Sequence, residues 1–250
     1  MASFSLTFKA GAGALDSVRK HGFDVSSIGT IAGASGGAKW LVLSKLDRAI
    51  HASIVPRLEG PVHLIGSSIG SWRFACYAQA DPVAAIERFE QAYLEQSYSD
   101  KPDVDEITAK SREILGIVLG EHGVEEILAN RLFRLHVLAV RSRAVMASEN
   151  RVLLGTALLT AALLNVASRA TLGWFFERAL FYDRRDRPPF FDLDGFPLQR
   201  IELSPGNLED AVAASGAIPL VLAGVRGIEG TARGVYRDGG IIDYHLDLPH

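Results

Sequence analysis

Short apolar runs alternate with helical patterns in the first third of the chain. Residues 27–31 and 62–65 form two such runs, each leading into glycines, which is typical of buried strands. After each run, apolar residues recur at steps of three and four, as on one helix face: Val42, Leu43, Leu46, Ala49 and Ile50, then Trp72, Ala75, Cys76 and Ala80. This alternation predicts an α/β fold with a mostly parallel central sheet and helices on its faces.

An additional strand–helix unit is predicted at the start of the chain, within residues 1–32. Its strand covers residues 4–8, and its helix covers 14–21 and ends at Gly22, a residue suited to a helix C-cap. The chain has no internal repeat and no low-complexity linker, so residues 1–250 are expected to form a single domain.

The middle of the chain, about residues 81–190, is predicted to be a helical region. Apolar spacing favours helices at 81–98 and 105–119, with a strand at 132–140. Three further elements are predicted towards the C-terminus: a strand at 198–203, a helix at 207–215 with Asn207 as its N-cap, and a strand at 234–242 interrupted by Asp238-Gly239-Gly240.

Composition and charge narrow the class of protein. Hydrophobic residues make up 48% of the 250 residues, which is enough for one sizeable core and excludes disorder as the main state. The net charge is −3 without any large run of like charges, so no nucleic-acid partner is expected. The single cysteine, Cys76, cannot form an internal disulfide, and no Cys/His cluster indicates a metal. We therefore expect no metal and no cofactor, in a reduced, cytoplasmic compartment.

One long uncharged stretch raises the question of membrane contact. It covers residues 152–168, between Arg151 and Arg169, and is shorter than the roughly 20 apolar residues that span a bilayer. A buried helix is the favoured interpretation. The aromatic residues Trp174, Phe175 and Phe176 that follow keep a peripheral contact with a membrane surface open. The N-terminal residues lack the pattern of a signal peptide, so none is expected.

Two segments match the pattern Gly-x-Ser-x-Gly, one centred on Ser35 and the other on Ser68. In this motif the serine lies on a sharp turn between a strand and a helix, where larger flanking side chains would collide with both. Each candidate follows a predicted strand and precedes a predicted helix. Only one of them can be the nucleophile of a single site.

The order of the segments favours Ser68 as the nucleophile. An acyl-transfer site needs backbone N–H groups aimed at the developing oxyanion, from a glycine-rich loop or a helix start. Gly36, Gly37 and Ala38 open a predicted helix upstream and are suited to supply such donors. Ser35 is then a small residue of this donor loop, and it remains the alternative nucleophile.

Four segments, taken in order, resemble the patatin-like phospholipase family. They are Gly-Gly-x-Lys at residues 36–39, Gly-x-Ser-x-Gly at 66–70, Ala-Ser-x-Ala-x-Pro at 214–219, and Asp-Gly-Gly at 238–240. Together they cover under half of the chain. The resemblance implies a three-layer α/β/α fold and a lipid acyl hydrolase of the phospholipase A type. Its substrates would be carboxylic esters of phospholipids or glycerolipids.

The resemblance also implies the role of each site residue. Ser68 corresponds to the nucleophile and Asp238 to its base, in a dyad without histidine. The backbone of Gly36, Gly37 and Ala38 corresponds to the oxyanion hole. In such a site the acyl group passes to the serine, and water then releases it.

Alternatives follow from residues that depart from the family pattern. Trp40 stands where the family usually has glycine, and Ile69 follows Ser68 where the family mostly has alanine or glycine. They motivate the alternative of a catalytically silent domain that binds lipid or a partner. A second alternative is an α/β-hydrolase in which His245 completes a Ser–Asp–His triad. Lys39 is a candidate contact for a phosphate head group, although an exposed lysine at a helix start is more often solvated.

Overall fold

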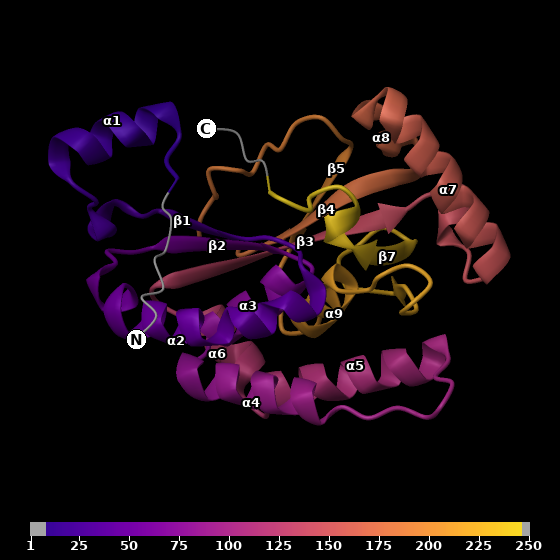
Figure 1. Ribbon diagram of the computed structural model, residues 1–250, viewed down its shortest axis with the longest axis horizontal. Coiled ribbons are helices and arrows are strands. Elements are labelled where there is room, and N and C mark those ends of the chain that lie inside the picture. The colour runs from indigo at the N-terminus through magenta and orange to yellow at the C-terminus, as the bar shows by residue number, and fades with distance from the viewer. Residues whose placement is uncertain (1–8, 247–250) are drawn as a thin grey trace, which may run out of the picture.

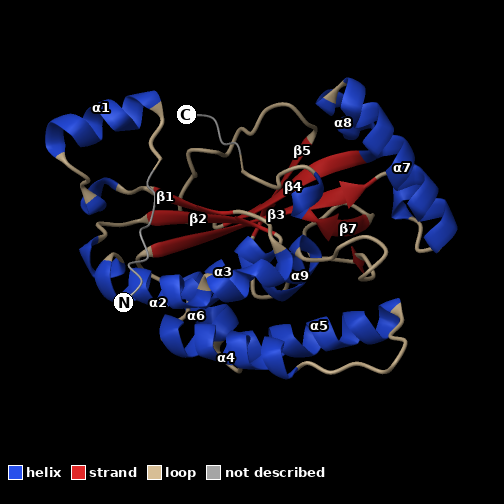
Figure 2. Ribbon diagram, in the orientation of Figure 1, coloured by secondary structure: helices blue, strands red, loops and turns tan. Residues whose placement is uncertain are grey.

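A seven-stranded sheet organises the computed structural model, which describes residues 9–246. The strands are β1 (Thr30–Gly33), β2 (Val62–Ser67), β3 (Phe133–Ser142), β4 (Phe176–Tyr182), β5 (Leu198–Glu202), β6 (Val225–Arg226) and β7 (Val235–Asp238). The helices are α1 (Ala12–His21), α2 (Ser44–Ser53), α3 (Ile69–Tyr77), α4 (Pro82–Glu95), α5 (Val104–Leu119), α6 (Gly123–Ala129), α7 (Arg151–Ala167), α8 (Leu172–Phe175) and α9 (Leu208–Ser215). Figure 2 shows the strands running through the middle of the molecule with helices around them.

The sheet is mostly parallel and has the order β1-β2-β3-β4-β5. Strands β1, β2 and β3 run in one direction, and β4 is parallel to β5. The antiparallel pairs are β3–β4, β3–β7 and β6–β7. The predicted α/β fold with a mostly parallel central sheet flanked by helices is therefore confirmed.

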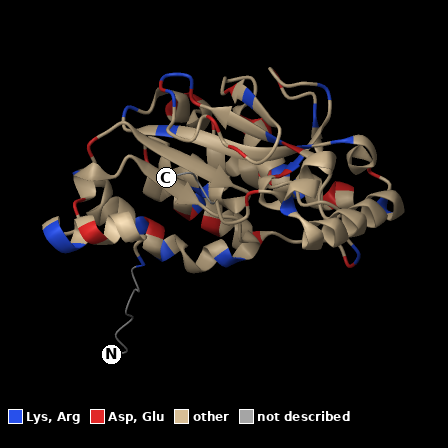
Figure 3. Cartoon of the chain, turned by 90° about the horizontal axis from the view of Figure 1, so that it is seen from above, with Lys and Arg blue, Asp and Glu red and all other residues tan. Residues whose placement is uncertain are grey.

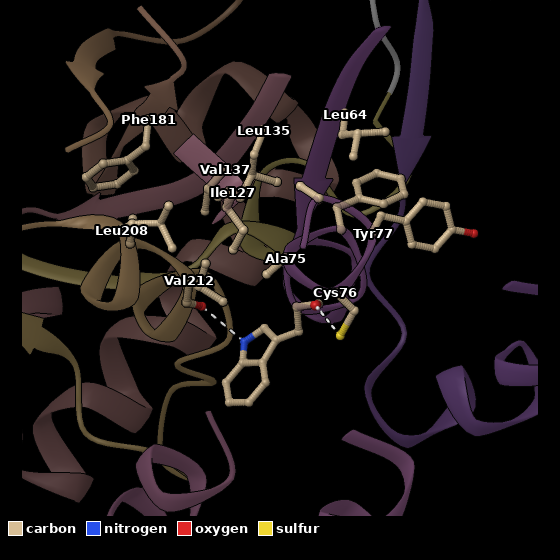
Figure 4. Close-up of a cluster of buried hydrophobic side chains, with 14 of the residues drawn as sticks. Leu64, Ala75, Cys76, Tyr77, Ile127, Leu135, Val137, Phe181, Leu208 and Val212 are labelled. Carbon is tan, nitrogen blue, oxygen red and sulfur yellow. Dashed lines mark hydrogen bonds between the residues drawn. The ribbon is translucent and has the colours of Figure 1, made fainter. Parts of the chain in front are cut away.

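One face of the sheet is covered by α3, α6 and α9, with α4 and α5 outside them (Figure 1). Figure 4 shows the core between the sheet and these helices, where Leu64, Leu135 and Phe181 of the strands face side chains of the helices. The indole N–H of Trp72 in α3 donates to the carbonyl of Val212 in α9 at 3.1 Å, which ties the two inner helices together.

The opposite face of the sheet has two covers. The loop at residues 183–197 brings Phe190 and Leu193 against Leu138 and Leu180 of the strands. Helix α7 covers the rest of this face with its inner residues, which pack against Val140 and Phe176: Leu154, Ala157 and Ala161. The sheet thus lies between two apolar layers.

Several predicted elements have the expected type with shifted bounds. The helix predicted at 14–21 is α1, and Gly22 beyond it has a φ of 79°. Asn207 occupies the N-cap position of α9, but its side chain accepts from the N–H of Ser204 (2.9 Å) instead of capping the helix. The strand predicted at 4–8 lies outside the described residues.

The helical middle region at 81–190 needs correction. It contains the predicted strand at 132–140, which is β3 and pairs with three other strands, and it also contains β4, which was not predicted. The sequence pattern gave no sign of β4, because Glu177 and Arg178 interrupt its apolar run. Arg178 is nevertheless buried, since its Nε and Nη2 each donate to one carboxylate oxygen of Asp243 at 2.7 Å.

Helix α7 corresponds to the long uncharged stretch of the sequence. Its 17 residues pack on the sheet along one side, as a buried helix would, but its other side is exposed. Within residues 9–246, no helix is long and apolar enough to cross a membrane.

Candidate active site

Ser68 and Asp238 come together because β2 and β7 share one edge of β3. Strand β2 pairs with residues 133–138 of β3, and β7 pairs with residues 139–142, while β4 occupies the other edge. The two shared-edge strands run towards each other, so the end of β2 meets the end of β7. The Ser68 hydroxyl donates to Asp238 Oδ2 at 2.6 Å, across 170 positions of the chain.

Ser68 occupies a strained turn between β2 and α3. Its φ of 55° and ψ of −128° lie in a region that costs a non-glycine residue about 1–3 kcal/mol. Close packing on both sides holds this turn. A Cβ on Gly66 would lie 2.5 Å from the N atom of Ser71, and one on Gly70 would lie 1.9 Å from the O atom of Gly33. The glycines of the second Gly-x-Ser-x-Gly motif are therefore required by contact.

Asp238 is held by its own turn. Its Oδ1 accepts from the N–H of Gly240 at 2.7 Å, which leaves Oδ2 for Ser68. The N–H of Asp238 donates to the carbonyl of Ala217 at 3.0 Å. Only 6% of the residue is exposed. Burial raises the pKa of Asp238 from 3.8 to about 6, while the hydrogen bonds from Ser68 and Gly240 oppose the rise.

A pocket of about 260 Å³ opens over this pair. Its lining combines the two polar residues with glycines and apolar side chains: Ser35, Gly36, Gly37, Ser68, Ile218, Pro219, Asp238, Gly240, Ile241 and Tyr244. Ile218 and Tyr244 are exposed at its rim. The site therefore joins a hydroxyl–carboxylate pair to a largely apolar wall, which suits an ester with an apolar acyl group.

The loop with the first glycine pair forms one side of the pocket. Gly36 precedes the short 3₁₀ helix Gly37–Val42, and Gly37 has a φ of 55°. Within residues 9–246, the N–H groups of Gly36, Gly37 and Ala38 donate no hydrogen bond to a protein acceptor. Gly36 and Gly37 line the pocket, so their donors are available to a molecule bound there, whereas Ala38 follows them in the chain and is not part of the lining.

The comparison with known families agrees with this geometry. The model of the family described as patatin-like phospholipase matches residues 48–245, which is most of the chain. The chain belongs to the patatin-like phospholipase family. A comparison with curated proteins found no match. Membership of this family indicates a lipid acyl hydrolase. The match includes Ser68 and Asp238, whereas Gly36 and Gly37 precede it.

The two departures from the patatin-like pattern have structural explanations. Trp40 is buried and stacks on Phe89 with ring centroids 4.0 Å apart, so it fills the core. Ile69 is partly buried, packs against the same core, and does not line the pocket. Neither side chain takes space from the pocket described above.

The other three candidate side chains, Ser35, Lys39 and His245, do not contact the Ser68–Asp238 pair through hydrogen bonds. Ser35 lines the pocket, but its hydroxyl donates to Ser67 Oγ at 3.1 Å and not to Asp238. Lys39 is exposed and is not part of the pocket lining. His245 is exposed, and its ring lies against Tyr244. Among the described residues it forms no hydrogen bond with Ser68 or Asp238, so the predicted triad order does not form a triad here.

Cys76 is buried in the core, where burial raises the pKa of its thiol to about 12. Within residues 9–246, no group of three or more His, Cys, Asp or Glu side chains is placed to hold a metal ion.

Sequence reasoning missed the contribution of Ser215. Its hydroxyl accepts from the N–H of Ser68 at 2.9 Å and donates to the carbonyl of Leu138 at 2.6 Å. It also lies 2.9 Å from Ser71 Oγ. One hydroxyl thus ties α9 to β3 and to the strained turn. Ser215 belongs to the Ala-Ser-x-Ala-x-Pro segment at 214–219, but that pattern alone does not indicate which groups its hydroxyl contacts.

Proposed function

We propose that the protein hydrolyses carboxylic esters of lipids by a phospholipase A-type reaction, with Ser68 as nucleophile and Asp238 as base. The observation that carries the proposal is the 2.6 Å hydrogen bond from the Ser68 hydroxyl to a buried carboxylate at the floor of an apolar pocket. A serine hydroxyl is a weak nucleophile until an adjacent base accepts its proton.

The proposed reaction has two steps. In the first, Ser68 Oγ bonds to the ester carbonyl carbon while its proton moves to Asp238, and the ester C–O bond then breaks as the alcohol leaves with that proton. In the second, water loses a proton to Asp238 and attacks the acyl carbon. The bond from that carbon to Ser68 Oγ then breaks, Ser68 Oγ takes the proton back from Asp238, and the fatty acid leaves. The pKa of about 6 supports this role, because it makes Asp238 a stronger base than an exposed aspartate yet leaves it ionised at pH 7.

The free N–H groups of Gly36, Gly37 and Ala38 are proposed to bind the oxyanion of each tetrahedral intermediate. Donors already aligned in a water-poor site stabilise such charge without reorganisation. The apolar wall formed by Ile218, Pro219 and Ile241 supports a substrate with an apolar acyl group. A carboxylic ester of a phospholipid or glycerolipid has both a carbonyl that forms an oxyanion and an apolar acyl group.

The test compares four proteins, the wild type and three variants, with a fluorophosphonate probe and with p-nitrophenyl esters. We expect the wild type to be labelled and active. We expect Ser68→Ala to lose labelling and at least about 1,000-fold in turnover, and Ser35→Ala to stay within a few-fold of the wild type. Asp238→Asn should also lose turnover, because its amide cannot accept the serine proton.

Three results would contradict the proposal. Loss of labelling only in Ser35→Ala would assign the nucleophile to the first motif. Retained turnover in both Ser68→Ala and Asp238→Asn would exclude the dyad. An unlabelled, inactive wild type that still binds lipid would favour the catalytically silent alternative.

A further inference from the structure

Helix α7 carries exposed apolar residues along its outer side. Four residues spaced by seven, four and three positions form the α7 outer stripe: Val152, Leu159, Leu163 and Val166, which are 76%, 61%, 65% and 87% exposed. The buried residues Leu154, Ala157 and Ala161 lie on the opposite side of the helix. Scattered exposed apolar residues need no explanation, but a stripe along a whole helix is typical of an interaction surface.

Trp174 extends this apolar surface. It belongs to α8 and is 68% exposed. Helices α7 and α8 lie together at one end of the molecule, opposite the end that carries α1 (Figure 1). An indole ring combines an apolar body with a polar N–H, which suits the boundary between lipid and water.

The charges within the α7–α8 segment itself have one sign, while Asp103, Asp105 and Glu149 line a pocket together with Arg151 near the start of the helix. Residues 150–176 contain two arginines, Arg151 and Arg169, and no acidic residue. The acids on either side are engaged by the fold: Glu149 accepts from Arg237 at 2.8 Å, and Glu177 accepts from Arg141 at 2.9 Å. Elsewhere on the molecule basic and acidic residues are interspersed, as Figure 3 shows.

We propose that the α7 outer stripe docks on the surface of an anionic lipid bilayer, with Arg151 and Arg169 beside the head groups and Trp174 at the boundary. The apolar side chains would enter the acyl region, and the cations would meet phosphate and carboxylate groups. A second copy of the chain is a poorer occupant. Residues 150–176 of a second copy would offer no carboxylate to Arg151 or Arg169, whereas an anionic bilayer does.

Helix α7 packs against a residue that lines the pocket, so docking of α7 would bring the pocket close to the bilayer. The inner side of the helix packs in one cluster with Leu220, Ile241 and Ile242, and Ile241 also lines the pocket over Ser68. Arg169 donates to the carbonyl of Ile242 at 2.6 Å. One helix width thus separates a bilayer on the outer stripe from a residue of the pocket lining, and Ile218 and Tyr244 are exposed at the pocket rim. Only this orientation argument rests on the proposed function.

The experiment measures sedimentation with two kinds of vesicle, phosphatidylcholine alone and phosphatidylcholine mixed with phosphatidylserine. Leu163→Gln is compared with Leu94→Gln, a matched control in α4 with nearly the same exposure, 65% against 64%. We expect Leu163→Gln to weaken vesicle binding roughly 10-fold, as loss of one buried leucine implies, and Leu94→Gln to change it little. Wild-type binding should be tighter to the mixed vesicles, and Arg151→Gln should reduce that preference.

Absence of wild-type binding to both vesicles, or equal effects of the two leucine substitutions, would overturn the proposal. A mass measurement covers the other occupant: a wild-type dimer that Leu163→Gln converts to a monomer would assign the stripe to a second copy. Ser68→Ala separates this inference from the proposed function. If that variant sediments like the wild type while the wild type hydrolyses no ester, the docking stands and the proposed function fails.

Discussion

The two Gly-x-Ser-x-Gly turns begin at paired positions of neighbouring strands, yet only one presents its serine to an acid. Gly33 of β1 and Gly66 of β2 are partners in the parallel register, so Ser35 and Ser68 start from equivalent places. After Ser68, α3 begins at once. After Ser35, the chain continues into a loop and a short 3₁₀ helix. The same sequence pattern thus produces two different local structures.

The glycines of the two turns serve different purposes. In the second turn Gly70 presses against the carbonyl of Gly33, so a side chain there has no room. In the first turn Gly36 and Gly37 have open space where a Cβ would be, and their N–H groups lie free beside the pocket. A glycine motif can therefore indicate close packing or accessible backbone donors, and the pattern alone does not distinguish them.

The two turns also differ in their contact with Asp238, which bonds Ser68 but not Ser35. Gly240 lies between Ser35 and Asp238, since a Cβ there would be 2.6 Å from Ser35 Oγ and 2.9 Å from Asp238 Oδ1. Its N–H holds Oδ1, so Oδ2 points to Ser68. Ser35 lines the same pocket and bonds Ser67 instead.

The largest expected effect is on stability, and it distinguishes the closely packed Gly70 from Gly36, which has open space around it. Gly70→Ala should lower the free energy of unfolding by about 3 kcal/mol or more, because its Cβ would overlap a backbone oxygen that cannot move aside. Gly36→Ala should change it by about 0.5 kcal/mol or less, since its φ of 179° suits any residue and nothing is near. Guanidinium titration measures both. Equal stability losses would show that the two turns do not differ as described.

The fold was predictable where amphipathic spacing decides it. Strands β2 and β3 and helices α4 and α5 carry their pattern locally. Strand β4 was not predictable, because its Arg178 is neutralised by Asp243, 65 positions away. No local pattern indicates that a charged residue has such a partner.

The site was predictable to the extent that motifs fix it. Ser68 was expected from its Gly-x-Ser-x-Gly motif and Asp238 from the resemblance to the patatin-like family, and the structure brings their side chains together. The hydroxyl of Ser215 was not expected, because its bond to the Ser68 N–H depends on how α9 packs on the sheet. Contacts of this kind depend on the packing of elements that are far apart in the sequence.

The loop after Ser35 is proposed to bind the oxyanion through its backbone N–H groups. Ala38→Pro removes one free donor in the first turn of a 3₁₀ helix, a position that tolerates proline. We expect kcat on p-nitrophenyl esters to fall roughly 10²–10³-fold, the usual loss for one oxyanion donor, with thermal stability retained. Ala38→Ser is the control, because it keeps the N–H. Equal kcat in the two variants would exclude the Ala38 donor.

Asp238→Asn tests how much the buried, ionised carboxylate next to Ser68 lowers the free energy of unfolding. The folded-state pKa of Asp238 is raised to about 6 by burial, so its protonated form is favoured on folding. Stability from this group is complete below pH 4 and is lost as pH rises through 6. We therefore expect the variant to gain up to about 3 kcal/mol over the wild type at pH 7.5, relative to their difference at pH 4. Urea titrations at both pH values measure this, and a pH-independent difference would contradict the raised pKa.

The smallest expected effect concerns the hydroxyl that holds the second turn. Ser215→Ala leaves the N–H of Ser68 and the carbonyl of Leu138 without their partner, so the turn loses its tie to α9. We expect kcat to fall about 10-fold with KM nearly unchanged, because the loss is in the aim of Ser68 and not in substrate contact. Ser71→Ala is the matched control, since Ser71 Oγ contacts Ser215 but not Ser68. If both variants lose the same activity, or if Ser215→Ala loses stability alone, Ser215 supports the fold without positioning the nucleophile.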